Sequence, residues 1–542
     1  MFDIRTSELL RAAPDLPELD AQQIPQMLTR HYAELVSARL KGEDDAASAE
    51  EPWSLDRIAD AYEIVASIEE DPALRRAAAF VAGTAQQIIA RRSSATLETG
   101  YTTPISRDGV DPAVSAAVLF LGAEQYADAY EAGASFPRSR GPFEIRILGD
   151  HIRDLVQGRL TSILDRANRW RIDAPIIGTI QTRAFRSLAS ALIEGIERLA
   201  ANLMAVAVPE ATPGRFATAQ DAFRKVIELC SNAELTGEEM LGGELRTAYA
   251  GPAHLASMLL SASDAIDQAA LAKLTPPDGA DASFWQRWLA FRAEDAPYVW
   301  RNHREAIRQG FYQTGNSAVL VLPTGAGKTT ISVLKIAATL ARGKKVVFLA
   351  PTHALVEQLT DDLQKMFPTD KFGLEVSSDY DSLLLEEAQL QDIEVMTPER
   401  CLAMLSYSPT SFQKVGLLVF DECHLLSAES GKIGRALDGM LCLLAFRAAV
   451  PDADMLFLSA MLKNGPEFSE WIEKLTGRRC LAVDLLWKPS RQARGVVTYE
   501  ENEIAQAVAQ AKAVQRAKNV QEKRLPRGCA QRPSVRSRRS LT

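Results

Sequence analysis

One eight-residue segment, residues 323–330, constrains the fold of this chain more than any other. It reads Pro-Thr-Gly-Ala-Gly-Lys-Thr-Thr, follows the apolar run at 317–322 and precedes residues with helical spacing at 331–338. A strand, a glycine-containing turn and a helix start form the geometry that binds phosphate through backbone N–H groups. The strict pattern has glycine at position 322, where this chain has leucine. The segment still predicts a nucleotide site.

The residue types of this segment predict how ATP and Mg²⁺ are held. Gly325 and Gly327 allow the backbone to curl around an anion, and Lys328 places a cation at the β- and γ-phosphates. The Thr329 hydroxyl is a candidate Mg²⁺ ligand. The predicted nucleotide-binding set is Pro323, Thr324, Gly325, Ala326, Gly327, Lys328, Thr329 and Thr330.

From about residue 297, short apolar runs alternate with helical patterns, which predicts a parallel sheet flanked by helices. Ligands of such sheets bind at the carboxyl ends of the strands. The predicted strands are Val319–Leu322, Lys345–Ala350, Ile393–Met396, Leu417–Phe420 and Met455–Leu458.

Two acids directly follow the fourth of these strands. Asp421 is predicted to hold Mg²⁺, and Glu422 to orient and deprotonate the attacking water. A solvated turn is the alternative interpretation of Asp421–His424, but the buried apolar strand before it argues against that.

Five ordered segments together resemble motifs I, Ia, Ib, II and III of superfamily 2 DEAD/DEAH-box (DExH) helicases. The resemblance covers about residues 297–500, and segments 464–471 and 487–489 are similar to the subgroup of exosome-associated, DNA-repair and bacterial defence helicases. The five segments are Pro323–Thr330, Ala350–Leu355, Thr397–Arg400, Asp421–His424 and Ser459–Met461.

The resemblance implies a RecA-like P-loop domain with ATPase and helicase activity that acts on DNA or RNA. It implies a catalytic set of Glu422, Asp421, Lys328 and His424, and coupling to nucleic acid through Ser459, Ala460 and Met461. Contacts with one strand's backbone are implied for Pro351, Thr352, Thr397, Pro398, Glu399 and Arg400. Thr397 and Pro398 also fit the start of a capped helix, and the two interpretations are compatible.

The motif that reads adenine in this family departs from its usual form. A glutamine is expected at position 304, where this chain has arginine, and Gln309 is the fallback. The sequence therefore leaves recognition of the base open.

The chain divides into a helical N-terminal domain at 1–290, a RecA-like domain at 291–490 and a charged helix with a basic tail at 491–542. The first of these is predicted to be all α and has no assigned role. Its expected helices are Gln22–Leu40, Ser54–Glu70, Pro72–Arg92, Ala113–Ala132, Ile152–Trp170 and Ala184–Val206.

Beyond Tyr499 the sequence shows no second motor domain with an arginine finger, so weak ATPase activity is expected of this chain alone. The tail is interpreted either as an electrostatic nucleic-acid binder or as a truncated or out-of-frame end. The alternative function is an ATP-binding, nucleic-acid-associated switch without translocation. A separate C-terminal motor domain or a second protein is the expected partner.

Composition limits the remaining possibilities. The net charge is −9, so any nucleic-acid surface must be local. The six cysteines form no C-x-x-C pair, and the N-terminus has no signal-peptide core. No apolar stretch is long enough to cross a bilayer, so a cytoplasmic protein without membrane contact is predicted.

Overall fold

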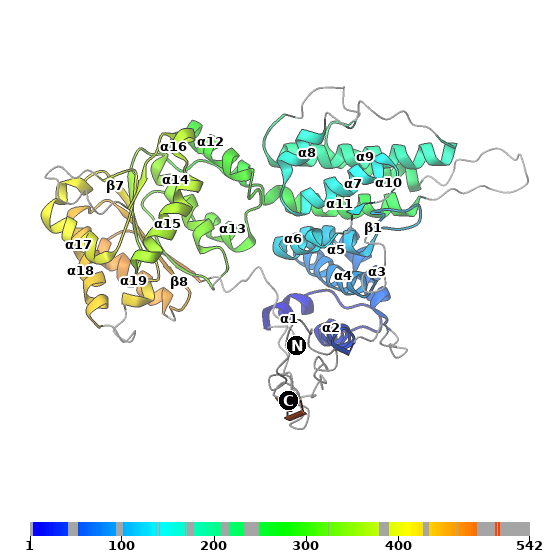
Figure 1. Cartoon of the computed structure of the whole chain (residues 1–542), viewed down its shortest axis with the longest axis horizontal. Helices are drawn as coiled ribbons and strands as arrows, with labels where there is room; N and C mark the ends of the chain where they lie inside the picture. The colour runs from blue at the N-terminus through cyan, green and yellow to red at the C-terminus, as the bar shows by residue number, and fades with distance from the viewer. Residues whose placement is uncertain are drawn as a thin grey trace, which may run out of the picture.

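The computed structural model describes residues 4–41, 53–93, 101–136, 138–139, 141–167, 170, 178–207, 216–231, 249–323, 325–378, 390–426, 433–462, 464–484, 505–506 and 508–509. These residues form a helical part and a part built on one sheet, which lie side by side in Figure 1. Helix α13 lies where the two parts meet.

The helical part has one hydrophobic core, to which α3, α4, α5, α9 and α11 contribute buried side chains. Tyr101–Thr102 (β1) and Arg138–Ser139 (β2) form a short parallel pair beside it. The short 3-10 helices are Ala21–Gln23 (η1) and Leu271–Lys273 (η2). The α-helices are α1 (Ile4–Arg11), α2 (Ile24–Lys41), α3 (Leu55–Ile68), α4 (Pro72–Ser93), α5 (Pro112–Gly122), α6 (Tyr126–Ala134), α7 (Phe143–Val156), α8 (Leu160–Ala167), α9 (Ile180–Leu203), α10 (Ala219–Ser231) and α11 (Ala250–Gln268).

Two helices predicted as continuous are each broken in two, so those predictions were wrong. The first breaks between α5 and α6, where Glu124 has a φ of 60°. The second breaks between α7 and α8, where Gly158 has a φ of 72° and packs against Pro297. Tertiary contacts, rather than local helix propensity, decide both breaks.

The other part is a seven-stranded, all-parallel sheet with the strand order β5-β6-β4-β7-β8-β3-β9. The five predicted strands are all present, and two short ones, β5 and β9, were not predicted. The strands are β3 (Ser317–Val321), β4 (Lys345–Leu349), β5 (Val376–Ser377), β6 (Ile393–Met396), β7 (Val415–Phe420), β8 (Asp454–Ser459) and β9 (Cys480–Asp484).

Alternate residues of each strand face opposite layers of helices, because side chains in a strand alternate between the two faces of the sheet. One face packs against α12, α13, α14 and α15, and the other against α17, α18 and α19. The bounds are α12 (Ala282–Ala293), α13 (Arg301–Arg308), α14 (Lys328–Leu340), α15 (His353–Met366), α16 (Thr369–Phe372), α17 (Pro398–Tyr407), η4 (Pro409–Phe412), η5 (Cys423–Leu426), α18 (Ile433–Ala449) and α19 (Gly465–Thr476).

The predicted domain boundary at 290/291 stays a prediction. Helix α12 lies before this boundary, yet its side chains Trp285 and Trp288 are buried in the core of the sheet part. The indole N–H of Trp288 donates to the carbonyl of Met366 at 3.2 Å.

A buried ionic cluster closes the amino edge of the sheet. Asp454, the first residue of β8, lies 2.9 Å from Arg478 and 3.6 Å from the ammonium of Lys335 on α14. The same ammonium donates to the carbonyls of Phe311 at 3.1 Å and Asn316 at 2.6 Å. Burial lowers the pKa of Lys335 to about 8, and the charge of Asp454 partly opposes that shift. The cluster joins α14, β8 and the loop before β3.

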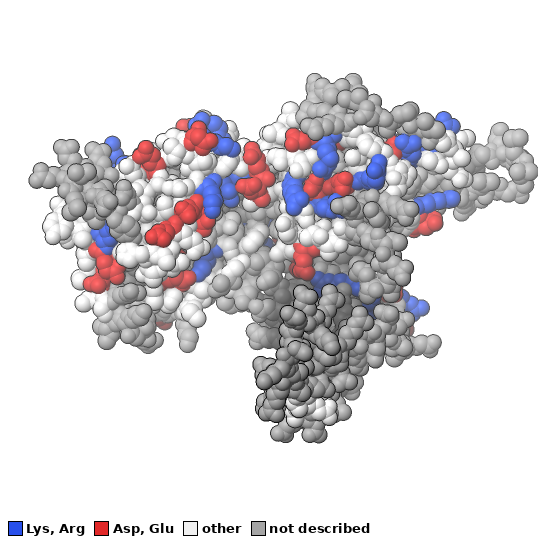
Figure 2. Space-filling view, viewed as in Figure 1, with Lys and Arg blue, Asp and Glu red and all other residues white. Residues whose placement is uncertain are grey.

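Acidic and basic side chains are interspersed on the face shown in Figure 2, over both parts of the described chain. Among the described residues, no helix is long and apolar enough to cross a membrane. The predicted charged helix and basic tail lie outside the described residues, apart from residues 505–506 and 508–509.

Candidate nucleotide site

The predicted phosphate-binding segment joins β3 to the start of α14. Gly325 and Gly327 both have left-handed backbones, with φ values of 81° and 79°. Gly327 is the N-cap of α14 and supplies no side-chain cap, so the first-turn N–H groups of a 13-residue helix point toward the loop. Such a helix start attracts anions. Thr324 lies outside the described residues, and Thr329 and Thr330 are exposed in the first turn.

Lys328 and Glu422 meet across this edge of the sheet although 94 residues separate them in the sequence. The Lys328 ammonium lies 2.9 Å from Glu422 Oε1, and both side chains are partly exposed. Lys328 begins α14 after β3, Glu422 follows β7, and β8 lies between these two strands. The parallel sheet therefore brings the predicted phosphate-binding cation and the predicted base together.

The backbone at Glu422 is unusual for a non-glycine residue, because its φ is 50°. Its N–H donates to Asp421 Oδ1 at 2.9 Å, and the N–H of Asp421 donates to the carbonyl of Leu349 on β4 at 2.9 Å. These bonds hold the two carboxylates side by side at the end of β7.

The pKa of Asp421 is raised, first by burial and then by the neighbouring charge of Glu422. Lys328 and His424 oppose that shift, but less strongly. Two carboxylates that share one lysine have an excess of negative charge, and their oxygens are the ligand type that Mg²⁺ prefers. The chemistry of this edge therefore fits a divalent cation.

His424 connects this pair to β8. Its Nδ1 lies 3.2 Å from Glu422 Oε2 and 3.4 Å from the hydroxyl of Ser459. Ser459 also accepts the N–H of Met461 at 3.1 Å, and its carbonyl accepts the N–H of Leu322 at 3.0 Å. The structure thus brings together the predicted coupling residues and the predicted catalytic carboxylate.

The residues predicted to contact a nucleic-acid strand follow the neighbouring strands β4 and β6. Thr352 and Thr397 are the N-caps of α15 and α17, each accepting a backbone N–H at 3.4 Å. Thr352 and Glu399 are exposed, whereas Thr397 is buried. Arg400 is also buried, and its guanidinium donates to the carbonyl of Ser378 at 3.0 Å. Pro351 and Pro398 lie directly beside the two caps.

Three residues before β3 contact the phosphate-binding segment and were missed in the sequence. Asn302 donates its amide to the carbonyl of Ala326 at 3.2 Å, and His303 Nε2 lies 3.2 Å from the same oxygen. His303 stacks on Trp300, with 5.3 Å between ring centres. Burial lowers the pKa of His303 to about 4, so its ring is neutral at physiological pH. The tryptophan and histidine at positions 300 and 303 were the available signal, but only a glutamine was sought in this segment.

Arg304 does not face the nucleotide site. Its guanidinium lies 2.5 Å from Glu124 of the helical part. Gln309, the fallback for reading adenine, donates to Glu305 on an exposed side of α13.

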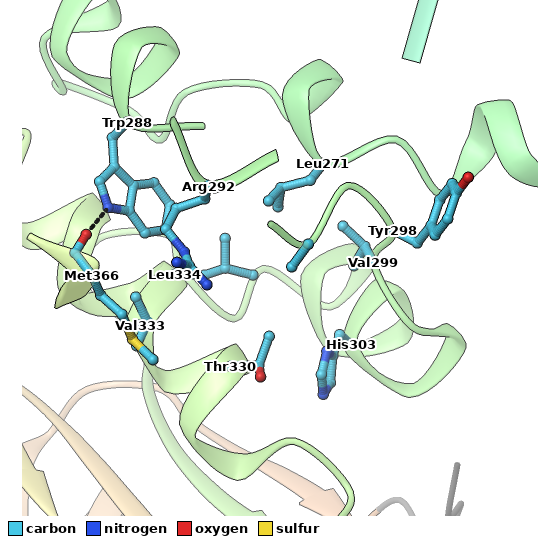
Figure 3. A pocket seen from close by; sticks show the side chains of 11 residues that line it. Leu271, Trp288, Arg292, Tyr298, Val299, His303, Thr330, Val333, Leu334 and Met366 are labelled. Atoms are coloured by element: carbon cyan, nitrogen blue, oxygen red, sulfur yellow. Dashed lines mark hydrogen bonds between the residues drawn. The ribbon is translucent and has the colours of Figure 1, made fainter. Parts of the chain in front are cut away.

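A pocket lies beside the first turn of α14 (Figure 3). Its lining combines apolar side chains from α12 and α14 with Arg292, His303 and Thr330. Figure 3 shows His303 and Thr330 on neighbouring helices, and Arg292 beside Leu334. The pocket therefore lies next to Thr330, the last residue of the phosphate-binding segment, and reaches α12.

Comparisons with known proteins match the same part of the chain. The sequence model of the DEAD/DEAH box helicase family matches residues 300–467. The ATP-dependent DNA helicase Hel308 of Thermoplasma acidophilum is 30% identical over 178 residues, which are 32% of this chain and 25% of the relative. The Hachiman protein HamB of Bacillus cereus is 25% identical over 214 residues, 38% of this chain and 18% of the relative.

The chain thus spans a quarter or less of the length of these relatives. Among solved structures, the match with the DUF1998 helicase MrfA covers 45% of this chain and 38% of the MrfA chain, at 21% sequence identity and a TM-score of 0.31. This likeness is too distant to add to the sequence match. The family match spans β3, α14, β7 and β8, which carry the geometry described above. Residues 300–467 are therefore a DEAD/DEAH box helicase domain, which places this part of the chain in helicase superfamily 2.

Proposed function

We propose that the sheet part is the first motor domain of an ATP-dependent nucleic-acid helicase or translocase, in which ATP hydrolysis is coupled to nucleic-acid binding. The observation that carries this proposal is the 2.9 Å contact between Lys328 and Glu422. It joins the cation of a glycine-containing phosphate loop to a carboxylate that is suited to activate water. The motor domain proposed here covers residues 291–490 together with α12.

The nucleotide's phosphates lie against the first turn of α14 in this proposal. The left-handed glycines 325 and 327 turn the backbone N–H groups toward the phosphates, and Lys328 exchanges its contact with Glu422 for the β- and γ-phosphates. A Cβ atom at Gly325 would meet nothing within 4 Å, which agrees with space for a ligand on that side.

Glu422 accepts the proton of the attacking water, and Asp421 with Thr329 holds Mg²⁺. Lys328 and His424 contact different oxygens of Glu422, which fixes the orientation of its carboxylate. Bound Mg²⁺ would withdraw negative charge from the phosphates that separate. The raised pKa of Asp421 supports this assignment, because a nearby cation would favour its charged form.

Nucleic acid lies along the helix starts after β4 and β6. Thr352 is exposed there, and contacts of its hydroxyl with the phosphate backbone would position a strand without reading its sequence. Arg400 supports this surface from inside through Ser378. The contact of His424 with Glu422 and Ser459 is the proposed route from the nucleotide to this surface. The sequence left the choice between DNA and RNA open, and a role in bacterial defence stays a prediction.

The experiment is an ATPase assay of the full chain with and without single-stranded DNA and RNA oligonucleotides. We expect hydrolysis that one of these stimulates, and none from Lys328→Ala, because that variant lacks the cation of the phosphate loop. Lys365→Ala is the control, since Lys365 is an exposed lysine whose contact is with Asp362 at 3.6 Å. Hydrolysis by Lys328→Ala at the wild-type rate would refute the proposed site, and lack of stimulation by both nucleic acids would refute the coupling.

A further inference from the structure

A buried carboxylate of the helical part, that of Glu124, contacts the sheet part. Glu124 lies in the turn between α5 and α6 and is 3% exposed. Its carboxylate lies 2.5 Å from Arg304 on α13 and 3.7 Å from Arg76 on α4. The left-handed backbone at Glu124 directs the carboxylate to a helix of the other part instead of continuing α5. The contact therefore crosses between the two parts.

The segment before α13 is held by the helical part as well. Tyr298 stacks on Tyr126 with 5.0 Å between ring centres, and its hydroxyl donates to the carbonyl of Leu155 at 2.7 Å. The N–H of Val299 donates to the carbonyl of Ala269 at 2.7 Å. Trp300 packs against the helical core. These contacts fix where α13 begins.

The same short helix holds the phosphate loop from its other side. Asn302 and His303 both contact the carbonyl of Ala326 at 3.2 Å. A Cβ atom at Gly327 would lie 2.7 Å from His303 and 2.9 Å from Trp300, so both rings lie directly against the loop. Residues 300–304 thus touch the helical part and the phosphate loop at once.

We propose that the helical part positions the phosphate loop through α13, with Glu124 and Arg304 as positioning residues, so that ATP affinity depends on this pair. The proposal rests on the function proposed above and gives the helical part a role at the same site. Arg304 stands where the helicase resemblance predicts an adenine-reading glutamine, so this position serves the contact between the parts instead. Because such coupling is reciprocal, nucleotide binding must then also change the stability of the α5–α6 turn that carries Glu124.

The test measures the affinity of the full chain for a fluorescent ATP analogue and, in parallel, its melting temperature and its turnover at saturating ATP. Glu124→Gln keeps the shape of the side chain and removes its charge. We expect it to weaken nucleotide binding by about five- to tenfold, while saturated turnover stays within about twofold. Glu144→Gln is the matched control, because Glu144 is equally buried and bonded to Arg186 at 2.8 Å, but within the helical part. It should lower the melting temperature without changing nucleotide affinity.

A double-mutant cycle separates the pair from general loss of stability. Arg304→Gln should weaken binding as much as Glu124→Gln, Arg304→Lys should restore most of the affinity, and the double glutamine variant should be no weaker than either single one. Hydrogen exchange adds a second readout: nucleotide should slow exchange at residues 120–126 in the wild type but not in Glu124→Gln. If Glu124→Gln does not fold, Tyr298→Phe, which keeps the ring and removes the bond to Leu155, should weaken binding by a smaller factor.

Each outcome decides between the two proposals. A wild-type chain that binds no ATP refutes the proposed function and this inference with it. Normal ATP binding with equal affinities in Glu124→Gln, Glu144→Gln and the wild type refutes the inference alone. Additive losses in the double variant would also refute it, because the two side chains would then act independently.

Discussion

Helix α14 carries two lysines in opposite surroundings, one at each edge of the sheet. Lys335, at the amino edge, is buried, donates to the carbonyls of Phe311 and Asn316, and lies near Asp454, which Arg478 also contacts. Lys328, at the carboxyl edge, is partly exposed and contacts Glu422. At the amino edge one carboxylate, that of Asp454, has two cationic partners. At the carboxyl edge two carboxylates, those of Asp421 and Glu422, have a single lysine between them.

This difference separates a structural cluster from a functional one. Buried charges that are fully paired hold elements together, and removal of one partner leaves the other unsatisfied. Charges that lack partners raise the energy of the folded chain unless a ligand supplies the missing charge. The excess of carboxylate over lysine at the carboxyl edge therefore indicates a cationic ligand. At the amino edge, the ammonium of Lys335 is satisfied by two backbone carbonyls as well as by Asp454, so no ligand is indicated there.

The largest expected effect is on hydrolysis at the carboxyl edge. Glu422→Gln should keep nucleotide binding and lower turnover by about 10²- to 10⁴-fold, because an amide cannot accept the proton of the attacking water. Lys328→Ala should instead abolish binding. The two variants are compared by titration with an ATP analogue and by steady-state ATPase rates. Equal losses of affinity would contradict this division of roles.

A large effect on stability is expected at the amino edge. Asp454→Asn removes the charge that Lys335 and Arg478 share, and should lower the free energy of unfolding of the sheet part by about 3–5 kcal/mol. Hydrogen exchange of the β3 and β8 amides in increasing urea measures this change locally. Asp452→Asn, two residues earlier and exposed, is the control and should have little effect.

A smaller effect on stability, of opposite sign, is expected for Asp421→Asn at the carboxyl edge. Burial raises the pKa of Asp421 above its ordinary value of 3.8, so the stability from its protonated form is complete below pH 3.8 and is lost as the pH rises through the raised pKa. At neutral pH the charged carboxylate therefore costs stability, and Asp421→Asn should unfold at a higher temperature than the wild type. The difference should shrink as the pH falls toward 4. If Asp421→Asn destabilises the chain as Asp454→Asn does, the contrast between the two edges is wrong.

The smallest expected effect concerns the link between the edge and β8. Ser459→Ala removes the 3.4 Å contact with His424 and should lower stimulation of the ATPase by nucleic acid about fivefold, as for a hydrogen bond contributing about 1 kcal/mol. Hydrolysis without nucleic acid should change little. Ser469→Ala, a buried serine that donates to the carbonyl of Cys480, tests whether loss of any serine hydroxyl in this part has the same result.

The sequence predicted the centre of the sheet well because β3, β4, β6, β7 and β8 are apolar runs, each followed by a segment with recognisable chemistry. It missed β5, which has only two residues, and β9, which has five. Such strands are specified by pairing with a neighbour more than by their own pattern. The helix breaks at Glu124 and Gly158 were missed for the same reason, since Arg304 and Pro297 are distant in the sequence.

Within the candidate site, the sequence predicted the side chains that belong to motifs. It did not predict the residues that contact the phosphate-binding segment from outside the motifs, Asn302 and His303. The pairing of Lys328 with Glu422 follows from two motifs at one edge of a parallel sheet. The contacts of Asn302 and His303 with Ala326 involve a carbonyl oxygen, which no residue type reveals. Arg304 shows the converse, because its residue type was noticed but its partner, 180 residues away, was invisible.

The strand order also determines when β3 acquires its neighbouring strands during synthesis of the chain. Strand β3 lies between β8 and β9, so its two hydrogen-bonding edges are covered by residues 454–459 and 480–484, made long after Val321. At ribosomal speeds of about 5–20 residues per second, roughly 10–30 s pass between synthesis of β3 and of β9. During that interval β3 exposes an apolar, unpaired edge of the kind that promotes aggregation. The helical part is already made by then, so during synthesis it is available as a surface on which residues 297–304 can settle before the sheet closes.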